Sequence, residues 1–192
     1  MPIRSAGILL YRPDPDAAAG SPVRDRLQVW IAHMGGPFWA RKDQHAWSIP
    51  KGEYAEGEDP LAAALREFGE EMGTPAPDTG YRLLGEFRQP SGKLITVFTA
   101  EADFAPDEIT SNTFPLEWPK GSGRIQHYPE IDDARWFPGQ EARLKLVKGQ
   151  LPILDALDRY AAGNGPEADN GSGAEKGPEA QDGEARSGHP RP

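Results

Sequence analysis

The sequence predicts an α/β domain of the α+β kind, in which helices cover a mixed central sheet. Apolar, β-branched runs occur both before and after the strongest helical segment, so the expected order is strands, helix, strands, helix. No internal repeat interrupts that order. The 192 residues, of which 37% are hydrophobic, suffice for one core. We therefore expect a single domain over residues 1–160.

Four strands are predicted from apolar runs that are bounded by turn-forming residues. They cover residues 5–11, 27–33, 82–87 and 94–100. A long segment rich in Pro, Asp, Ala and Gly separates the first two, and Pro90, Ser91 and Gly92 predict a hairpin turn between the last two. A fifth, short strand is predicted at residues 135–137.

Two helical segments are predicted. Residues 60–72 form the stronger one, because Asp59 can cap its amino end, Pro60 suits the first helical position and Gly73 ends it. The other covers residues 139–160 and is interrupted near Gly149 and Pro152.

Composition limits the function. The net charge of -9 argues against a surface that coats a nucleic-acid duplex, and the absence of cysteine excludes disulfides, thiolate zinc sites and cysteine nucleophiles. No apolar run predicts a membrane span or a secretory signal, so we expect a cytoplasmic protein with a small-molecule partner. The tail, residues 161–192, has almost nothing apolar to bury and is expected to be disordered. Oligomeric state is left open.

The helix over residues 60–72 carries an acidic cluster. Leu61, Leu65, Phe68 and Met72 are expected to share the face that packs on the sheet, which leaves three carboxylates on an exposed patch. These are Glu67, Glu70 and Glu71. Like charges at this spacing repel, and a hard divalent cation such as Mg²⁺ or Mn²⁺ would relieve the repulsion. Taken alone, such a cluster is more often plain solvated surface.

The surrounding residues favour the metal hypothesis. Pro50, Lys51, Gly52 and Glu53 form a glycine-containing loop whose backbone can approach an anion or a metal. The segment of residues 52–73 resembles the Nudix box, a fixed pattern of glycines, glutamates and one Arg-Glu pair. The matching residues are Gly52, Glu58, Arg66, Glu67, Phe68, Glu70, Glu71 and Gly73.

The resemblance extends over about residues 3–160, where the chain is similar to a subgroup of predicted bacterial MutT-like NTP pyrophosphohydrolases. Residues 5–11, 35–43 and 46–53 carry it outside the box. Phe68 is bulkier than the usual aliphatic residue, and Thr74 stands where an aliphatic one is expected. Both departures concern helix packing rather than the acids.

The resemblance implies an α/β/α sandwich and metal-dependent hydrolysis of a phosphoanhydride bond. It implies that the metal ligands, for Mg²⁺ or Mn²⁺, are Gly52, Glu67, Glu70 and Glu71. Arg66 would organise the acids and Glu58 would support the loop. Glu70 is the first candidate for the general base, and Glu117, Glu130 and Asp132 are unranked later candidates.

Residues before the box are candidates for substrate binding, because aromatic rings stack on bases and cations meet phosphates. They are Trp39, Arg41, Lys42 and Lys51, in a segment that also holds Phe38, His45 and Trp47. For Trp47 and Phe38 the alternative is packing in the core or a loop, favoured for Trp47. Lys120 to Arg124 lack P-loop spacing and are expected to form a surface turn.

The leading function is therefore a pyrophosphohydrolase acting on a nucleoside triphosphate or a related NDP-X compound. A dinucleoside polyphosphate such as diadenosine tetraphosphate is the alternative substrate. A non-catalytic nucleotide sensor is the alternative of another class, although such a protein need not keep all three glutamates. Zinc and serine-hydrolase chemistry are disfavoured, because the four histidines show no paired spacing and no serine has the nucleophile-elbow pattern.

Overall fold

A computed structural model describes residues 3–164. Its strands are β1 (Arg4–Pro13), β2 (Leu27–Met34), β3 (Trp47–Ser48), β4 (Lys51–Glu53), β5 (Arg82–Arg88), β6 (Leu94–Glu101), β7 (Thr113–Glu117), β8 (Ile125–Pro129) and β9 (Ile131–Pro138). Its α-helices are α1 (Pro60–Met72), α2 (Gly139–Lys145) and α3 (Leu151–Arg159). Short 3-10 turns lie at Val23–Asp25 and Lys148–Gln150, and a π-turn follows α3 at Tyr160–Asn164.

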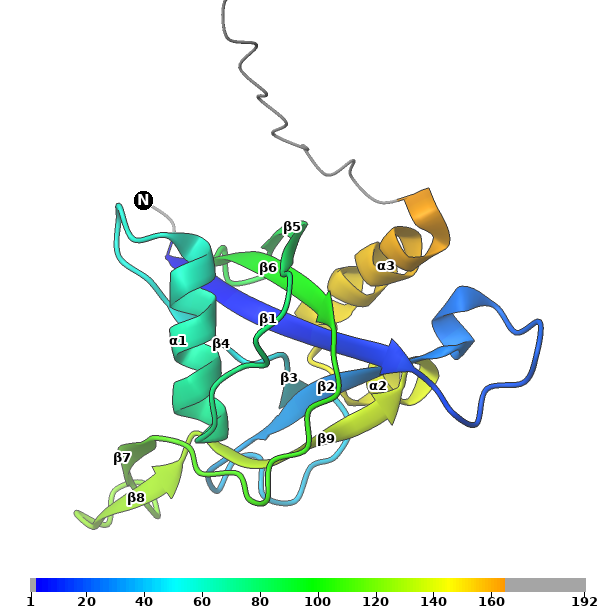
Figure 1. The fold of residues 1–192 in the computed structure, drawn as a ribbon. Coiled ribbons are helices and arrows are strands. Elements are labelled where there is room, and N and C mark those ends of the chain that lie inside the picture. The colour runs from blue at the N-terminus through cyan, green and yellow to red at the C-terminus, as the bar shows by residue number, and fades with distance from the viewer. Residues whose placement is uncertain (1–2, 165–192) are drawn as a thin grey trace, which may run out of the picture.

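A mixed seven-stranded sheet forms the centre of the fold (Figure 1). Its main path runs β3-β2-β1-β6-β5, with β4 paired to β1 and β9 paired to β2. Strand β1 is parallel to β6 and antiparallel to both β2 and β4. Because β4 occupies the amino-terminal end of β1, the residues just before α1 are fixed to the middle of the sheet.

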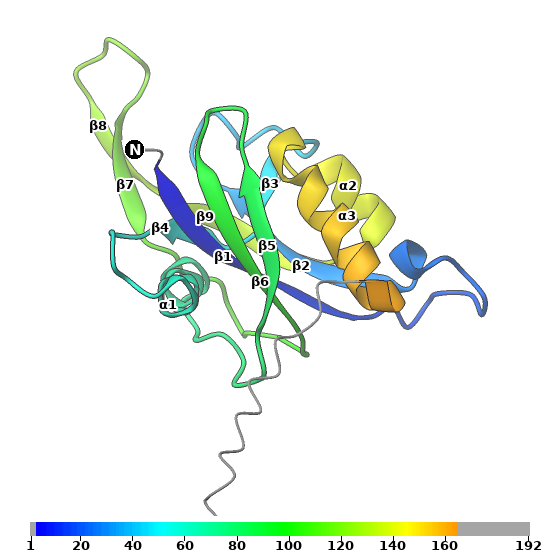
Figure 2. The same ribbon diagram turned by 90° about the horizontal axis from the view of Figure 1, so that it is seen from above.

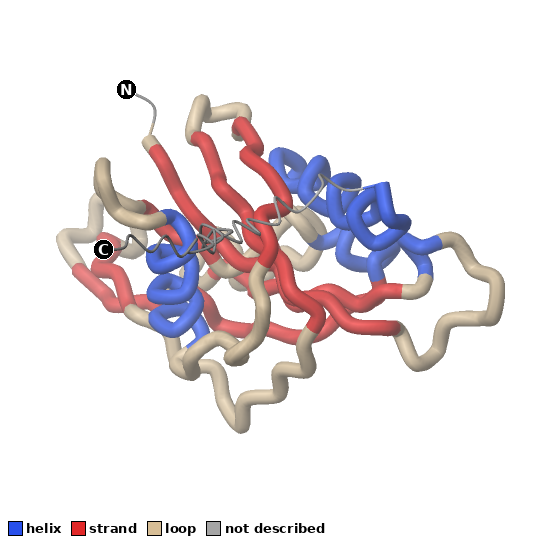
Figure 3. The backbone as a smooth tube through the Cα atoms, turned by 45° about the horizontal axis from the view of Figure 1, so that its top comes forward, coloured by secondary structure: helices blue, strands red, loops and turns tan. Residues whose placement is uncertain are grey.

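Helices cover both faces of this sheet. Figures 2 and 3 show α1 on one side and the pair α2 and α3 on the other. The alternation of side chains along β1 supplies both cores, since Ile8 and Leu10 pack toward α1 while Leu9 packs toward α3. The predicted mixed sheet with covering helices, and the α/β/α sandwich, are confirmed.

Helix α1 begins and ends as predicted. The side chain of Asp59 accepts a hydrogen bond from the Ala62 N–H at 2.9 Å, Pro60 opens the helix and Gly73 ends it with a left-handed φ of 70°. Its packing face, however, differs from the prediction.

The buried residues of α1 are Ala63, Ala64, Phe68, Glu71 and Met72, whereas Leu61 and Leu65 are only half-buried. The two small alanines let the helix approach β1 closely, and this turns the buried stripe toward Glu71. The expectation of three carboxylates on one exposed patch was therefore wrong.

Most other predicted elements are confirmed with small changes at their ends. The turn after β5 is closed by Gln89, whose N–H donates to the Lys93 carbonyl at 2.8 Å. The predicted second helix is divided at Lys148–Gln150 into α2 and α3. The loop around Gly52 was predicted without a strand but contains β4, and the β7–β8 hairpin was not predicted. Lys120 to Arg124 form the turn of that hairpin, as expected of a surface turn.

Most of the predicted tail lies outside the described residues. Only residues 161–164 of it are described, and they belong to the π-turn at Tyr160–Asn164. Within residues 3–164, no helix combines the length and apolar character that crossing a membrane requires.

Candidate metal-binding and catalytic groove

A polar groove of about 390 Å³ lies where β4, α1 and the segment before β9 meet. Its lining contains four carboxylates, two lysines and two aromatic rings. These residues are Glu53, Glu67, Glu71, Glu130, Lys51, Lys93, Trp39 and Phe114. The groove therefore combines ligands for a hard cation with groups that suit phosphates and a base.

Gly52 allows a carboxylate to lie directly against the sheet. It pairs with Ala6 in the β1–β4 ladder, and a Cβ at this position would lie 1.7 Å from Oε2 of Glu67. A side chain here would displace the Glu67 carboxylate, which α1 and the hydrogen bond from Arg66 to its other oxygen hold in this position. Glycine is thus required here for close approach.

Glu71 is a buried carboxylate on the groove wall, with 7% of its surface exposed. Its Oε2 accepts a hydrogen bond from the Lys51 N–H at 3.0 Å. Burial raises the pKa of Glu71 to about 7, the Lys51 charge and the backbone hydrogen bond oppose the rise, and the charges of Glu67 and Glu130 add to it. Glu67 and Glu130 are thus each near enough to repel the Glu71 carboxylate.

Arg66 gathers the remaining acids on the outer side of α1. Its Nη1 donates to Glu67 at 2.6 Å and to Glu70 at 3.4 Å, and its Nη2 donates to Glu58 and to the Glu53 carbonyl, each at 3.3 Å. These carboxylates raise the pKa of Arg66, with the hydrogen bond to Glu67 the largest cause. The side chain of Glu67 is 15% exposed and that of Glu70 is 42% exposed.

The groove has the donor set that a divalent cation needs, although the donors are not gathered at one point. Among residues 3–164, no three His, Asp or Glu side chains are close enough to form a preformed metal site. Nevertheless, Glu67 and Glu71 flank the backbone of Lys51 and Gly52, and Glu71 is a buried anion that a cation would stabilise. We conclude that the residues fit an oxygen-ligated cation such as Mg²⁺ or Mn²⁺.

The structure brings together only part of the predicted site. Gly52, Glu67, Glu71, Lys51 and Trp39 line the groove. Glu58, Arg66 and Glu70 form the ion-pair network beside it. Arg41 is exposed on the loop after Trp39, and Lys42 stacks its Nζ over the Trp39 ring at 4.8 Å from the centroid.

Of the three later acids considered as bases, one reaches the groove. Glu130 lines it. Asp132 accepts from His33 at 2.5 Å on the other face of the sheet, and Glu117 accepts from the Gly123 N–H at 2.6 Å within the β7–β8 hairpin.

Sequence reasoning did not find Lys93 or Phe114. Lys93 follows the β5–β6 turn, and its Nζ meets Glu53 Oε1 at 2.8 Å. Phe114 lies on β7, packed against Gly36. Lys93 reaches the groove through the β1–β6 pairing and Phe114 through the contact of the β7–β8 hairpin with Gly36, and neither contact leaves a local signal in the sequence.

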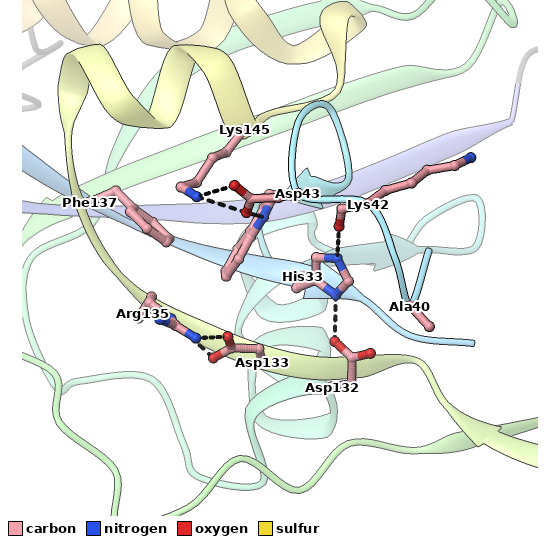
Figure 4. Close-up of a pocket in the computed structure, with 10 residues that line it drawn as sticks. His33, Ala40, Lys42, Asp43, Asp132, Asp133, Arg135, Phe137 and Lys145 are labelled. Carbon is pink, nitrogen blue, oxygen red and sulfur yellow. Dashed lines mark hydrogen bonds and ion pairs between the residues drawn. The ribbon is translucent and has the colours of Figure 1, made fainter. Parts of the chain in front are cut away.

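A second, charged pocket lies on the α2 side of the sheet (Figure 4). There Asp43 accepts from buried Lys145 at 2.7 and 2.8 Å, and Asp133 pairs with Arg135. The His33 ring points between Asp132 and the Lys42 carbonyl, which lies 2.7 Å from Nε2.

These contacts attach the loop after β2 to β9 and α2, so the pocket has a structural explanation. Trp47 packs in the core beside this pocket with 3% exposure, which confirms the core alternative for that residue.

Comparisons with known proteins agree with this geometry. The family model described as NUDIX domain matches residues 13–157. An RNA pyrophosphohydrolase of Rhodospirillum rubrum is 41% identical over 145 residues, which cover 74% of this chain and 74% of that protein.

Two solved structures are similar in fold. The NUDIX domain of Shewanella oneidensis NrtR, complexed with ADP ribose, has a TM-score of 0.56 at 15% identity and covers 83% of this chain and 88% of that one. A C. elegans Ap4A hydrolase binary complex has a TM-score of 0.53 at 19% identity and covers 84% and 98%.

Proposed function

This chain belongs to the NUDIX family, and from that premise we propose that it is a divalent-metal-dependent pyrophosphohydrolase acting on a nucleoside diphosphate linked to a further group. One observation carries the proposal. Glu67 and buried Glu71 flank the Gly52 backbone inside a groove that also presents Lys51 and Lys93. Such a site can hold a cation and a phosphate chain side by side.

We assign the residues of the groove as follows. Glu67, Glu71 and the backbone at Gly52 would hold the metal, with Glu70 joining them by leaving Arg66. When bound, Mg²⁺ or Mn²⁺ neutralises phosphate oxygens and lowers the pKa of a coordinated water. Lys51 and Lys93 bind and orient the phosphates by charge. Arg66 fixes the loop before α1 through the Glu53 carbonyl and the Glu58 carboxylate, and so holds the loop in position beside the acids of the helix.

The general base is assigned from position in the groove. Glu130 lines the same groove as Gly52, and its charge reaches Glu71. Glu70, the first candidate from sequence, is hydrogen-bonded to Arg66 outside the lining. We therefore expect the Glu130 carboxylate to accept the proton of the attacking water and Glu70 to act as a ligand.

The proposed substrate is a nucleotide with a phosphoanhydride bond, and three classes of such compounds are candidates. The relatives are named RNA pyrophosphohydrolase, and an RNA chain has a phosphoanhydride only where its 5′ end carries a polyphosphate; the sequence points to nucleoside triphosphates or dinucleoside polyphosphates. Trp39 and Phe114 give the groove two rings for a base, which all three kinds share.

Product analysis tests the proposal. The full chain is incubated with Mg²⁺ or Mn²⁺ and with ATP, 5′-triphosphorylated RNA, diadenosine tetraphosphate and ADP-ribose, and the products are separated by ion-exchange chromatography. Hydrolysis that Glu67→Gln abolishes and that Glu56→Gln retains supports the proposal, since Glu56 is exposed on the loop before α1. Binding of these nucleotides without any hydrolysis would favour the sensor instead.

A further inference from the structure

The β7–β8 hairpin projects from the domain beside the end of α1 (Figures 1 and 2). It forms its own two-stranded sheet, outside the central one, with Phe114 opposite Tyr128 and Leu116 opposite Gln126. Side chains alternate along each strand, so these four residues share one face, while Glu117 and Ile125 share the other. One face of this hairpin therefore carries the two aromatic rings, and the other face does not.

The aromatic face of the hairpin continues the wall of the catalytic groove. Phe114 lines the groove, and a Cβ on Gly36 would lie 3.0 Å from its ring and 3.8 Å from Tyr128. Two residues further along that loop, the Phe38 ring meets the Trp118 ring edge-to-face, with centroids 5.1 Å apart and planes at 76°. A row of rings thus leads from the groove outward along β7.

The outer end of this row is open to solvent. Phe38 is 56% exposed despite its contact with Trp118. Single exposed rings are common on protein surfaces, but this one continues a row of rings that begins inside the groove, and an aromatic face open to solvent can stack on a base. The four residue steps from Phe114 to Trp118 span roughly 13 Å of strand, which is too far for a single base to contact both rings.

Cations flank the row. Lys42 lies over Trp39 next to Phe38, and Lys120 and Arg124 lie at the tip of the hairpin beyond Trp118. Within the described part of the chain, neither Lys120 nor Arg124 makes an ion pair. On a chain with a net charge of -9, exposed rings between unpaired cations suit a base that is joined to phosphates.

We propose that Phe38 and Trp118 form a stacking subsite for a second nucleobase of the substrate. The inference rests on the proposed function and makes it narrower: the preferred substrate carries two bases, one near the groove and one on the hairpin. The second base belongs either to the next nucleotide of a 5′-triphosphorylated oligonucleotide or to the far nucleoside of a dinucleoside polyphosphate. Both substrates would present the same group to the Phe38 and Trp118 rings, a nucleobase joined to phosphates.

The test compares substrates with one base and with two. The ratio of kcat/KM for the triphosphorylated dinucleotide pppApA, or for diadenosine tetraphosphate, to that for ATP is measured with the full chain. Stacking on an aromatic side chain predicts a ratio of roughly 5 to 100. Phe38→Leu keeps the apolar bulk but removes the π face and should bring the ratio near one, and Phe38→Trp should restore it.

Ile125→Ala is the matched control, because Ile125 is 63% exposed on the opposite face of the same hairpin and should leave the ratio unchanged. A high ratio for pppApA alone identifies the oligonucleotide source, and one for diadenosine tetraphosphate alone identifies the dinucleoside source. A ratio near one for both, or a ratio that Phe38→Leu does not lower, overturns the subsite.

If no substrate is hydrolysed, the proposed function fails while the subsite is still decided by binding. Titration calorimetry then compares the Kd values of ATP, pppApA and diadenosine tetraphosphate for the parent chain and for Phe38→Leu. Tighter binding of a two-base ligand that Phe38→Leu abolishes supports the subsite. Equal Kd values for all three ligands contradict it.

Discussion

Replacing Glu71 by Gln should stabilise the metal-free protein while it abolishes activity. The carboxyl is 7% exposed, and burial raises its pKa from the ordinary 4.5 to about 7, so at pH 8 the fold holds a buried anion. That difference corresponds to an upper limit of roughly 3 kcal/mol, and relaxation around the site brings our expectation to about 1–3 kcal/mol. The amide oxygen of Gln can still accept from the Lys51 N–H.

The stability advantage of Glu71→Gln over the parent should grow as pH rises and should never reverse. A carboxyl with a raised pKa in the folded state makes the free energy of unfolding fall as pH rises from about 4.5 to about 7. Parent and Glu71→Gln should therefore be equally stable near pH 4.5, differ increasingly up to about pH 7 and keep that difference above it. The measurement is urea denaturation in EDTA at several pH values.

Metal provides a second arm of the same experiment. Mg²⁺ or Mn²⁺ binds only the folded parent, so it should raise the parent's stability and reduce or reverse the advantage of Glu71→Gln. Glu70→Gln is the control, because its side chain is 42% exposed and its change in EDTA should stay below about 1 kcal/mol. A Glu71→Gln protein that is less stable than the parent at pH 8 in EDTA, or equally shifted at all pH values, would refute the reasoning.

Three further changes test the same framework. Gly52→Ala places a Cβ against the Glu67 carboxylate and should lower metal affinity by about 10- to 100-fold; metal titration with wild-type affinity would contradict this. Arg66→Lys loses the forked contacts to its acids, so kcat should fall about 10-fold, while urea stability changes by under ~1 kcal/mol because the pairs are partly exposed. Phe68→Ala empties a fully buried position against Phe104 and should cost about 3–5 kcal/mol in urea unfolding, and a loss below 1 kcal/mol would show that α1 packs differently.

Local signals explain what the sequence predicted well. The ends of α1 were predicted correctly because Asp59, Pro60 and Gly73 act within one turn of the helix. The five predicted strands exist because their apolar residues join the two cores on which the helices pack, although on β5 only Leu84 is buried. The box residues beside the groove were found through the family pattern, which needs no knowledge of the fold.

Tertiary packing explains what the sequence missed. The leucines of α1 suggested one packing face, but Ala63 and Ala64 are fully buried and Glu71 lies on the buried side of the helix, at the groove wall. Lys93 reaches the groove only through the β1–β6 pairing, and Glu130 was one of three unranked candidates because the β2–β9 pairing that places it there joins residues far apart in the chain. Strands β7 and β8 face solvent over much of their length and therefore lack a buried alternating pattern.

The acids on α1 and in the loop before it divide into two groups, and this division predicts how the site responds to a cation. Glu58, Glu67 and Glu70 share the positive charge of Arg66, whereas Glu71 faces the groove with a backbone N–H and the Lys51 charge. Glu67 stands between the two groups, because it contacts Arg66 on one side and packs against Gly52 on the other. A cation entering the groove would therefore relieve the least compensated acid first and compete with Arg66 for Glu67. Metal binding and the ion pairs of Arg66 are thus coupled through the Glu67 carboxylate. The absence of a side chain at residue 52 leaves the room that this carboxylate occupies.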